Sequence, residues 1–121
     1  MTFSADDLAA IADATKVRIE TQAPGRPVHR TIIWIVVDDG RAFVRSHRGP
    51  RARWYREALA NPAVAIHVAG RRIPATAIPA DDPDSIERTS AALLKKYRGD
   101  PAATSMVREE ILATTLRLEP A

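Results

Sequence analysis

Cysteine is absent from this 121-residue chain, which excludes a disulfide framework, a thiolate zinc site and a thiol nucleophile. Long apolar runs are absent too. No window approaches the roughly 18 uninterrupted apolar residues that a membrane-spanning helix needs, so we expect no membrane partner. The N-terminal segment carries Asp6, Asp7 and Asp13 and lacks the basic start of a secretion signal. These absences favour a cytoplasmic enzyme or binding domain.

The remaining composition is that of an ordinary folded domain. Apolar residues make up 45% of the chain and charged residues 27%. This is close to globular usage and excludes a disordered, fibrous or collagen-like chain. The length predicts a single domain over residues 1–121.

Two kinds of site have little support in the sequence. The histidines, His29, His47 and His67, show no two- or four-residue spacing, so we expect no metal site. The formal net charge of +3 is compatible with nucleic-acid binding. Aromatic residues make up only 5% of the chain, however, and no nucleic-acid motif appears, so nucleic acid is not the expected partner.

Local patterns predict the secondary structure. Ser4 is placed to cap a first helix, with Asp7 at the third helical position, and Asp82 is placed to cap a later one. Alternating and β-branched runs predict strands over residues 16–22, 30–37, 41–47, 63–69, 73–79 and 112–118, with helices over residues 51–60 and 84–98. Prolines demote the strand over 73–79 toward an edge position. Strands joined by short turns pair antiparallel. This predicts an α+β fold with a small, closed or partly closed barrel of about six strands and helices packed on its rim.

Asp39-Gly40 is the best-defined piece of local geometry, because Asp-Gly is a strong hairpin signal. If these two residues form the loop, Val37 faces Ala42, and the same register continues to Ile33 opposite Ser46. The face that these residues share is apolar and is expected to line the barrel core.

The opposite face of this hairpin combines apolar and aromatic side chains with a basic end. The register places Trp34 opposite Arg45, close enough for stacking or a cation–π contact. Too many apolar side chains gather here for a solvated strand face: Ile32, Trp34, Val36 and Phe43. Something therefore covers this face, and the candidates are a helix of the same chain, a second subunit or a planar ligand.

Arginines gather around the open end of the hairpin. Hairpin pairing is expected to bring Arg30 close to Arg48, and the helix beginning near Arg51 points its free N–H groups toward that end. Forked guanidinium donors favour phosphate, so these residues predict a phosphate cradle: Arg30, Ser46, Arg48, Arg51 and Arg53. The alternative is that the arginines are solvated or pair with Glu57 and the acidic turns.

Several motifs occur together in residues 24–68. The pattern Gly-x-x-x-x-Arg-Thr begins at Gly25 and leads into the strand over residues 30–37. A hairpin follows, and its second strand ends in a small polar residue. Next comes a basic helix that contains Trp54-Tyr55 and closes with Leu59, Asn61 and Pro62. Together these motifs resemble the FMN-binding split-barrel superfamily. That superfamily includes the pyridoxamine-phosphate-oxidase-like and the deazaflavin-dependent nitroreductase-like proteins.

The resemblance implies a homodimeric split β-barrel that binds FMN or a deazaflavin coenzyme. It also implies an oxidoreductase acting on an unidentified small molecule. By position, Arg30 matches the strand arginine that contacts the cofactor phosphate. Ser46 and His47 match the strand end that meets the phosphate, and Arg51 or Arg53 matches a second basic ligand. The candidate cofactor-binding residues are Arg30, Thr31, Trp34, Arg45, Ser46, His47, Arg48, Arg51, Arg53 and Trp54.

Two departures from the family pattern leave the choice between FMN and deazaflavin open. Trp34 stands where the deazaflavin branch usually has proline, leucine or another aliphatic residue, and the Gly-Gly-Ala loop of that branch is reduced to Arg48-Gly49-Pro50. No catalytic acid or base is indicated. The alternative function is a cofactor-free, dimeric split-barrel module in which the apolar face is wholly a subunit interface.

Overall fold

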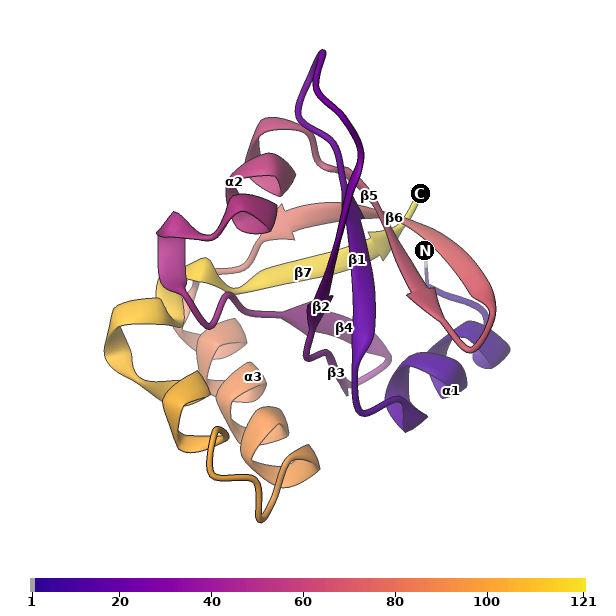
Figure 1. The fold of residues 1–121 in the computed structure, drawn as a ribbon. Helices are drawn as coiled ribbons and strands as arrows, with labels where there is room; N and C mark the ends of the chain where they lie inside the picture. The colour runs from indigo at the N-terminus through magenta and orange to yellow at the C-terminus, as the bar shows by residue number, and fades with distance from the viewer. Residues whose placement is uncertain (1) are drawn as a thin grey trace.

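The computed structural model describes residues 2–121, and it confirms the predicted α+β class. One antiparallel sheet of seven strands, in the order β2-β1-β5-β6-β7-β4-β3, curls into a half-barrel with helices around it (Figure 1). The strands are β1 (Val17–Thr21), β2 (His29–Ile33), β3 (Val36–Asp38), β4 (Arg41–Val44), β5 (Ala63–Val68), β6 (Arg71–Pro79) and β7 (Leu116–Pro120). The helices are α1 (Ala5–Asp13), α2 (Arg53–Ala60) and α3 (Pro83–Lys96), with short 3₁₀ helices η1 (Gly49–Arg51), η2 (Thr104–Val107) and η3 (Glu109–Thr114). Within residues 2–121, no helix is both long and apolar enough to span a membrane.

Capping side chains start two of the helices as predicted. The Ser4 hydroxyl accepts a hydrogen bond from the Asp7 N–H at 3.1 Å and begins α1. An Asp82 carboxylate oxygen accepts one from the Ser85 N–H at 3.0 Å and begins α3. Each cap satisfies an N–H group that the first helical turn leaves without a partner.

The predicted strand over residues 30–37 is two strands, β2 and β3, which lie at opposite edges of the sheet. β3 pairs with β4 around the Asp39-Gly40 turn in the predicted register, with Val37 opposite Ala42. β2 instead pairs with β1. The expected continuation of the hairpin to Ile33 opposite Ser46 is therefore wrong.

The break between β2 and β3 is held by side chains of the third helix. The Ile35 N–H donates to the Tyr97 hydroxyl at 3.3 Å, and Ile35 O accepts from Lys96 Nζ at 2.7 Å. A buried peptide must find hydrogen-bond partners, and here the C-terminal end of α3 supplies them in place of a neighbouring strand. The chain can therefore leave one sheet edge and cross to the other.

Two strands in the second half of the chain also differ from expectation. β6 lies between β5 and β7 in the middle of the sheet, so the expected edge position of residues 73–79 is wrong. Its ladder with β7 runs from Ala75 to Pro79, and Pro74 lies just outside it. Pro79 closes this ladder, so neither proline removes an N–H from the middle of the β6–β7 pairing. β7 starts later than expected, because residues 112–114 belong to η3.

Apolar side chains pack on both faces of the sheet. The core inside the half-barrel contains residues of the expected inner face: Ile33, Ile35, Ala42 and Val44. A second core packs Val36 and Phe43 against the helical layer, chiefly Leu93, Tyr97, Met106 and Ile111. Helices of the same chain thus cover this part of the outer face, which is one of the three covers expected from the sequence.

Candidate functional site

A cleft of about 960 Å³ opens beside β2 and is bounded by the start of α2, by η1, and by Ala102 and η2. Its lining residues are Lys16, Thr31, Ile32, Ile33, Trp34, Arg45, His47, Arg48, Arg51, Ala52, Arg53, Trp54, Arg56, Ala102 and Met106. The structure thus brings together eight of the ten candidate residues, all except Arg30 and Ser46. The sequence did not indicate Lys16 or Arg56.

The cleft is cationic. Its lining includes six lysine and arginine side chains and no aspartate or glutamate. Arg53 Nε lies 3.8 Å from a carboxylate oxygen of Glu57. For this arginine, the structure therefore shows the ion pair with Glu57 that the sequence offered as the alternative to a phosphate contact. The other exposed cations of the lining, Lys16, Arg48, Arg51 and Arg56, have no carboxylate within ion-pair distance in the part of the chain that the structure describes. Their charge is available to an anionic ligand.

The N-terminus of α2 adds to this positive potential. Ala52 is the N-cap and offers no side-chain acceptor, and the first turn contains no acidic residue. The first N–H groups of a helix carry partial positive charge, and acidic side chains there stabilise it. This chain places Arg51 and Arg53 at that position. The arrangement disfavours the isolated helix and favours a bound anion.

Trp34 forms an aromatic wall of the cleft. Its indole stacks on the Tyr97 ring with centroids 3.8 Å apart and planes 6° from parallel. The Tyr97 hydroxyl donates to Thr15 O at 2.7 Å, so the ring beneath Trp34 is fixed. Trp34 itself is half-buried and presents the rest of its surface to the cleft. Trp54, by contrast, is 5% exposed and belongs mainly to the inner core.

Arg45 is not paired with Trp34 across two strands, so the expected cross-strand pair is wrong. The residue is 1% exposed, and its guanidinium donates to four neutral oxygens: Thr115 Oγ1, Ser90 Oγ, Met106 O and Ile86 O, at 2.9–3.1 Å. The pairing of β3 with β4 ends before this position, which frees Arg45 to point under α3. Burial lowers the pKa of Arg45 to about 10, so the group stays charged at neutral pH.

Arg30 and Ser46 lie outside the cleft. Arg30 projects from the opposite face of β2 to Thr31, and its Nε lies 3.9 Å from Glu20 on the neighbouring strand. The hairpin pairing that was expected to bring Arg30 close to Arg48 is absent, because β2 pairs with β1 and not with β4. The buried Ser46 hydroxyl donates to Gly49 O at 2.7 Å. It thereby shapes the turn that carries Arg48.

Thr31 has an unsatisfied hydroxyl. Its Oγ1 is buried and has no hydrogen-bond partner, although the residue lines the cleft. Leaving such a group unpaired costs roughly 1–3 kcal/mol. A polar ligand atom that reached this oxygen after a rotation about χ1 would remove that cost.

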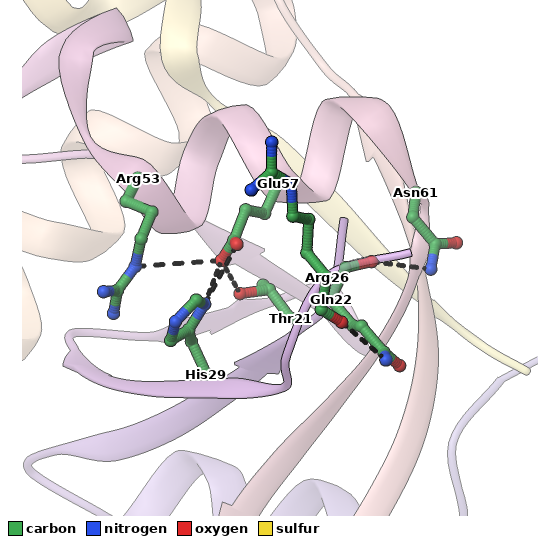
Figure 2. A network of polar contacts seen from close by, with 7 residues as sticks. All are labelled: Thr21, Gln22, Arg26, His29, Arg53, Glu57 and Asn61. Atoms are coloured by element: carbon green, nitrogen blue, oxygen red, sulfur yellow. Dashed lines mark hydrogen bonds and ion pairs between the residues drawn. The ribbon is translucent and has the colours of Figure 1, made fainter. Parts of the chain in front are cut away.

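A buried carboxylate, which the sequence did not indicate as a site residue, ties α2 to the sheet (Figure 2). Glu57 accepts hydrogen bonds from Thr21 Oγ1 at 2.9 Å and from His29 Nδ1 at 3.0 Å, with Arg53 close by. Burial raises the pKa of Glu57, but the bonds from Thr21 and His29 and the nearby charge of Arg53 outweigh burial and hold it below its usual value. Glu57 therefore fixes the helix that carries the basic end of the cleft.

Replacing this carboxylate should destabilise the fold in a pH-dependent way. A folded-state pKa below the unfolded value means that Glu57 stabilises the fold above the unfolded pKa of about 4.3. That contribution is lost as pH falls through the folded-state pKa. We expect Glu57→Gln to lower the free energy of unfolding by about 1–3 kcal/mol at pH 7, and by less at pH 3, in urea titrations. Glu87→Gln, on the exposed face of α3, is the matched control. An equal loss at both pH values would contradict the assignment.

Several solved structures share this fold. A putative pyridoxamine 5'-phosphate oxidase from Listeria innocua gives a TM-score of 0.68 at 15% identity, covering 95% of this chain and 90% of that chain. HutZ, the heme storage protein from Vibrio cholerae, gives 0.68 at 15% identity, covering 100% and 92%. An F420-H2 dependent reductase (FDR-A) gives 0.64 at 16% identity, covering 87% and 94%. These likenesses confirm the split-barrel fold.

At the level of sequence, no curated protein matches this chain. Residues 7–118 match a family described as uncharacterized protein conserved in bacteria (DUF2255). That match spans nearly the whole chain and includes every residue of the cleft lining. The chain is therefore a split-barrel protein that belongs to the DUF2255 family.

Proposed function

We propose that the cleft binds a planar, phosphate-bearing cofactor of the flavin type, FMN or a deazaflavin, and that the protein is an oxidoreductase acting on a small molecule. The observation that carries this proposal is the lining itself. Four exposed cations that have no carboxylate within ion-pair distance among residues 2–121 line the cleft beside an aromatic wall: Lys16, Arg48, Arg51 and Arg56. A volume of about 960 Å³ lies at the upper end of the range for cofactor and small-molecule sites.

The residues present fit such a cofactor at two places. Arg48 and Arg51, together with the uncapped start of α2, offer forked donors and helix N–H groups to a phosphate. The indole of Trp34 and the apolar side chains of Ile33 and Met106 offer a wall to a flat ring system. The likeness in fold to a putative pyridoxamine 5'-phosphate oxidase and to an F420-H2 dependent reductase supports the same class of ligand.

The chain's own contribution to the reaction is binding and orientation. A bound flavin or deazaflavin would supply the hydride chemistry. The arginines at the start of α2 would anchor the phosphate, and Trp34, immobilised by Tyr97, would set the plane of the ring.

We also infer that the protein acts as a homodimer with β2 in the interface. β2 is an edge strand, and Ile32 on it is 59% exposed while also lining the cleft. A second copy packed over Ile32 would bury this side chain and narrow the mouth of the cleft.

A thermal titration tests the proposed function. The purified protein is melted with FMN and, separately, with a deazaflavin coenzyme, each at concentrations up to 1 mM. A ligand that binds only the folded state at 100 times its dissociation constant stabilises it by about 2.7 kcal/mol, so at least one cofactor should raise the melting temperature by several degrees. Arg98→Ala, which removes an exposed arginine that does not line the cleft, should keep this shift. No shift with either cofactor would overturn the proposal and favour the cofactor-free dimeric module.

A further inference from the structure

We propose that the cleft contains a second anion subsite at Lys16, which binds the carboxylate of a planar small-molecule substrate. This inference rests on the proposed function, because it names the class of substrate that the same cleft would take. The cations of the lining do not form one cluster. Four arginines lie around η1 and the start of α2, whereas Lys16 precedes β1.

The strand register places the backbone of Lys16 and the residues that hold the partner of Arg53 at opposite ends of one ladder. The β1–β2 ladder runs from Val17 opposite Ile33 to Thr21 opposite His29, which is about 13 Å at about 3.3 Å per residue. Glu57, the partner of Arg53, is hydrogen-bonded to Thr21 and His29 at the far end of this ladder. Lys16 lies one residue beyond the near end. In Figure 1, β1 correspondingly runs from beside α1 toward α2.

The arginine end is the better site for a phosphate. The arginine end alone offers several forked donors and the start of a helix, which suffices for a phosphate. Lys16 is then free for another anion. Among residues 2–121, no carboxylate lies within ion-pair distance of Lys16. Asp13 does not line the cleft, although it lines an adjoining groove together with Lys16.

The surroundings of Lys16 indicate the shape of that anion. Val17 is opposite Ile33 in the β1–β2 ladder. Extending this register by one residue places Lys16 opposite Trp34. Ile32, Ile33 and Trp34 all line the cleft. A compact ammonium group beside an aromatic and apolar wall suits a carboxylate attached to a flat, apolar body. An aromatic carboxylate meets both requirements.

The experiment uses a matched pair of probes, 2-naphthoate and 2-naphthamide, which share the ring system and differ in charge. Binding to the protein without cofactor is measured by isothermal titration calorimetry. The wild type should bind the carboxylate about 10-fold more tightly than the amide, and Lys16→Ala should abolish this preference. Lys95→Ala, an exposed lysine on α3, should retain it. Melting temperatures of the variants confirm folding, which is expected because Lys16 is exposed.

A second arm separates this inference from the proposed function. Arg51→Ala should weaken FMN binding and keep the preference for naphthoate over naphthamide, whereas Lys16→Ala should abolish that preference. Equal binding of naphthoate and naphthamide by the wild type, or a preference that survives Lys16→Ala, would overturn the subsite. A failure to bind any flavin while the Lys16-dependent preference persists would overturn the proposed cofactor and leave the subsite standing.

Discussion

Arg45→Ala is expected to lower the free energy of unfolding by about 3–5 kcal/mol, the largest stability effect of any substitution considered for this chain. The Arg45 side chain is almost fully buried and donates to two hydroxyls and two backbone carbonyls. Alanine would leave these acceptors without a donor and would open a cavity under α3. Native domains are stable by only about 5–15 kcal/mol, so the variant would lose a large share of its stability.

Urea unfolding followed by circular dichroism measures this effect, and two further variants locate its cause. Arg45→Met fills most of the volume without donating hydrogen bonds, so it should recover only the cavity contribution. Arg41→Ala, four residues earlier and exposed, should change stability by less than about 0.5 kcal/mol. A loss below about 1 kcal/mol in Arg45→Ala would show that the buried guanidinium does not hold α3 and η2 on the sheet.

The second large effect concerns binding. Arg51→Ala and Arg48→Ala should each weaken FMN binding by about 10- to 100-fold, because one hydrogen bond to a charged group contributes about 1.5–3 kcal/mol. Both side chains are exposed, line the cleft and lack a carboxylate partner among residues 2–121. Their loss should therefore leave stability nearly unchanged. Quenching of flavin fluorescence measures the affinity, with Arg98→Ala as the control. Affinity that falls equally in Arg98→Ala would indicate a general charge effect and contradict a phosphate site at α2.

Features determined by neighbouring residues could be predicted from the sequence. The Asp39-Gly40 turn, the Ser4 and Asp82 caps and the inward-facing residues Ile35 and Ala42 all depend on interactions within a few positions. The cluster of arginines that lines the cleft also arises from one short segment, residues 48–56. Local pattern and local chemistry suffice for such features.

Features determined by distant residues could not be predicted. The run of β-branched and aromatic residues continues unbroken through Trp34 and Ile35. The strand nevertheless ends there, because Tyr97 and Lys96 bind the Ile35 peptide from the far end of α3. The predicted register places Arg45 opposite Trp34, whereas its position under α3 depends on oxygens more than forty positions away.

The contribution of Lys16 to the cleft was hidden for the same reason. It lies far from the arginine cluster along the chain, and only the pairing of β1 with β2 brings it to the cleft. Short-range patterns carry no information on that pairing.

The central claim, a phosphate-anchored planar ligand at the start of α2, is tested most directly by comparing FMN with riboflavin. The two ligands share a ring system and differ in the phosphate. The wild type should bind FMN at least about 10-fold more tightly than riboflavin, and the Arg48→Ala/Arg51→Ala double variant should bind both with the same, weak affinity. Equal affinity of the wild type for FMN and riboflavin would contradict the account.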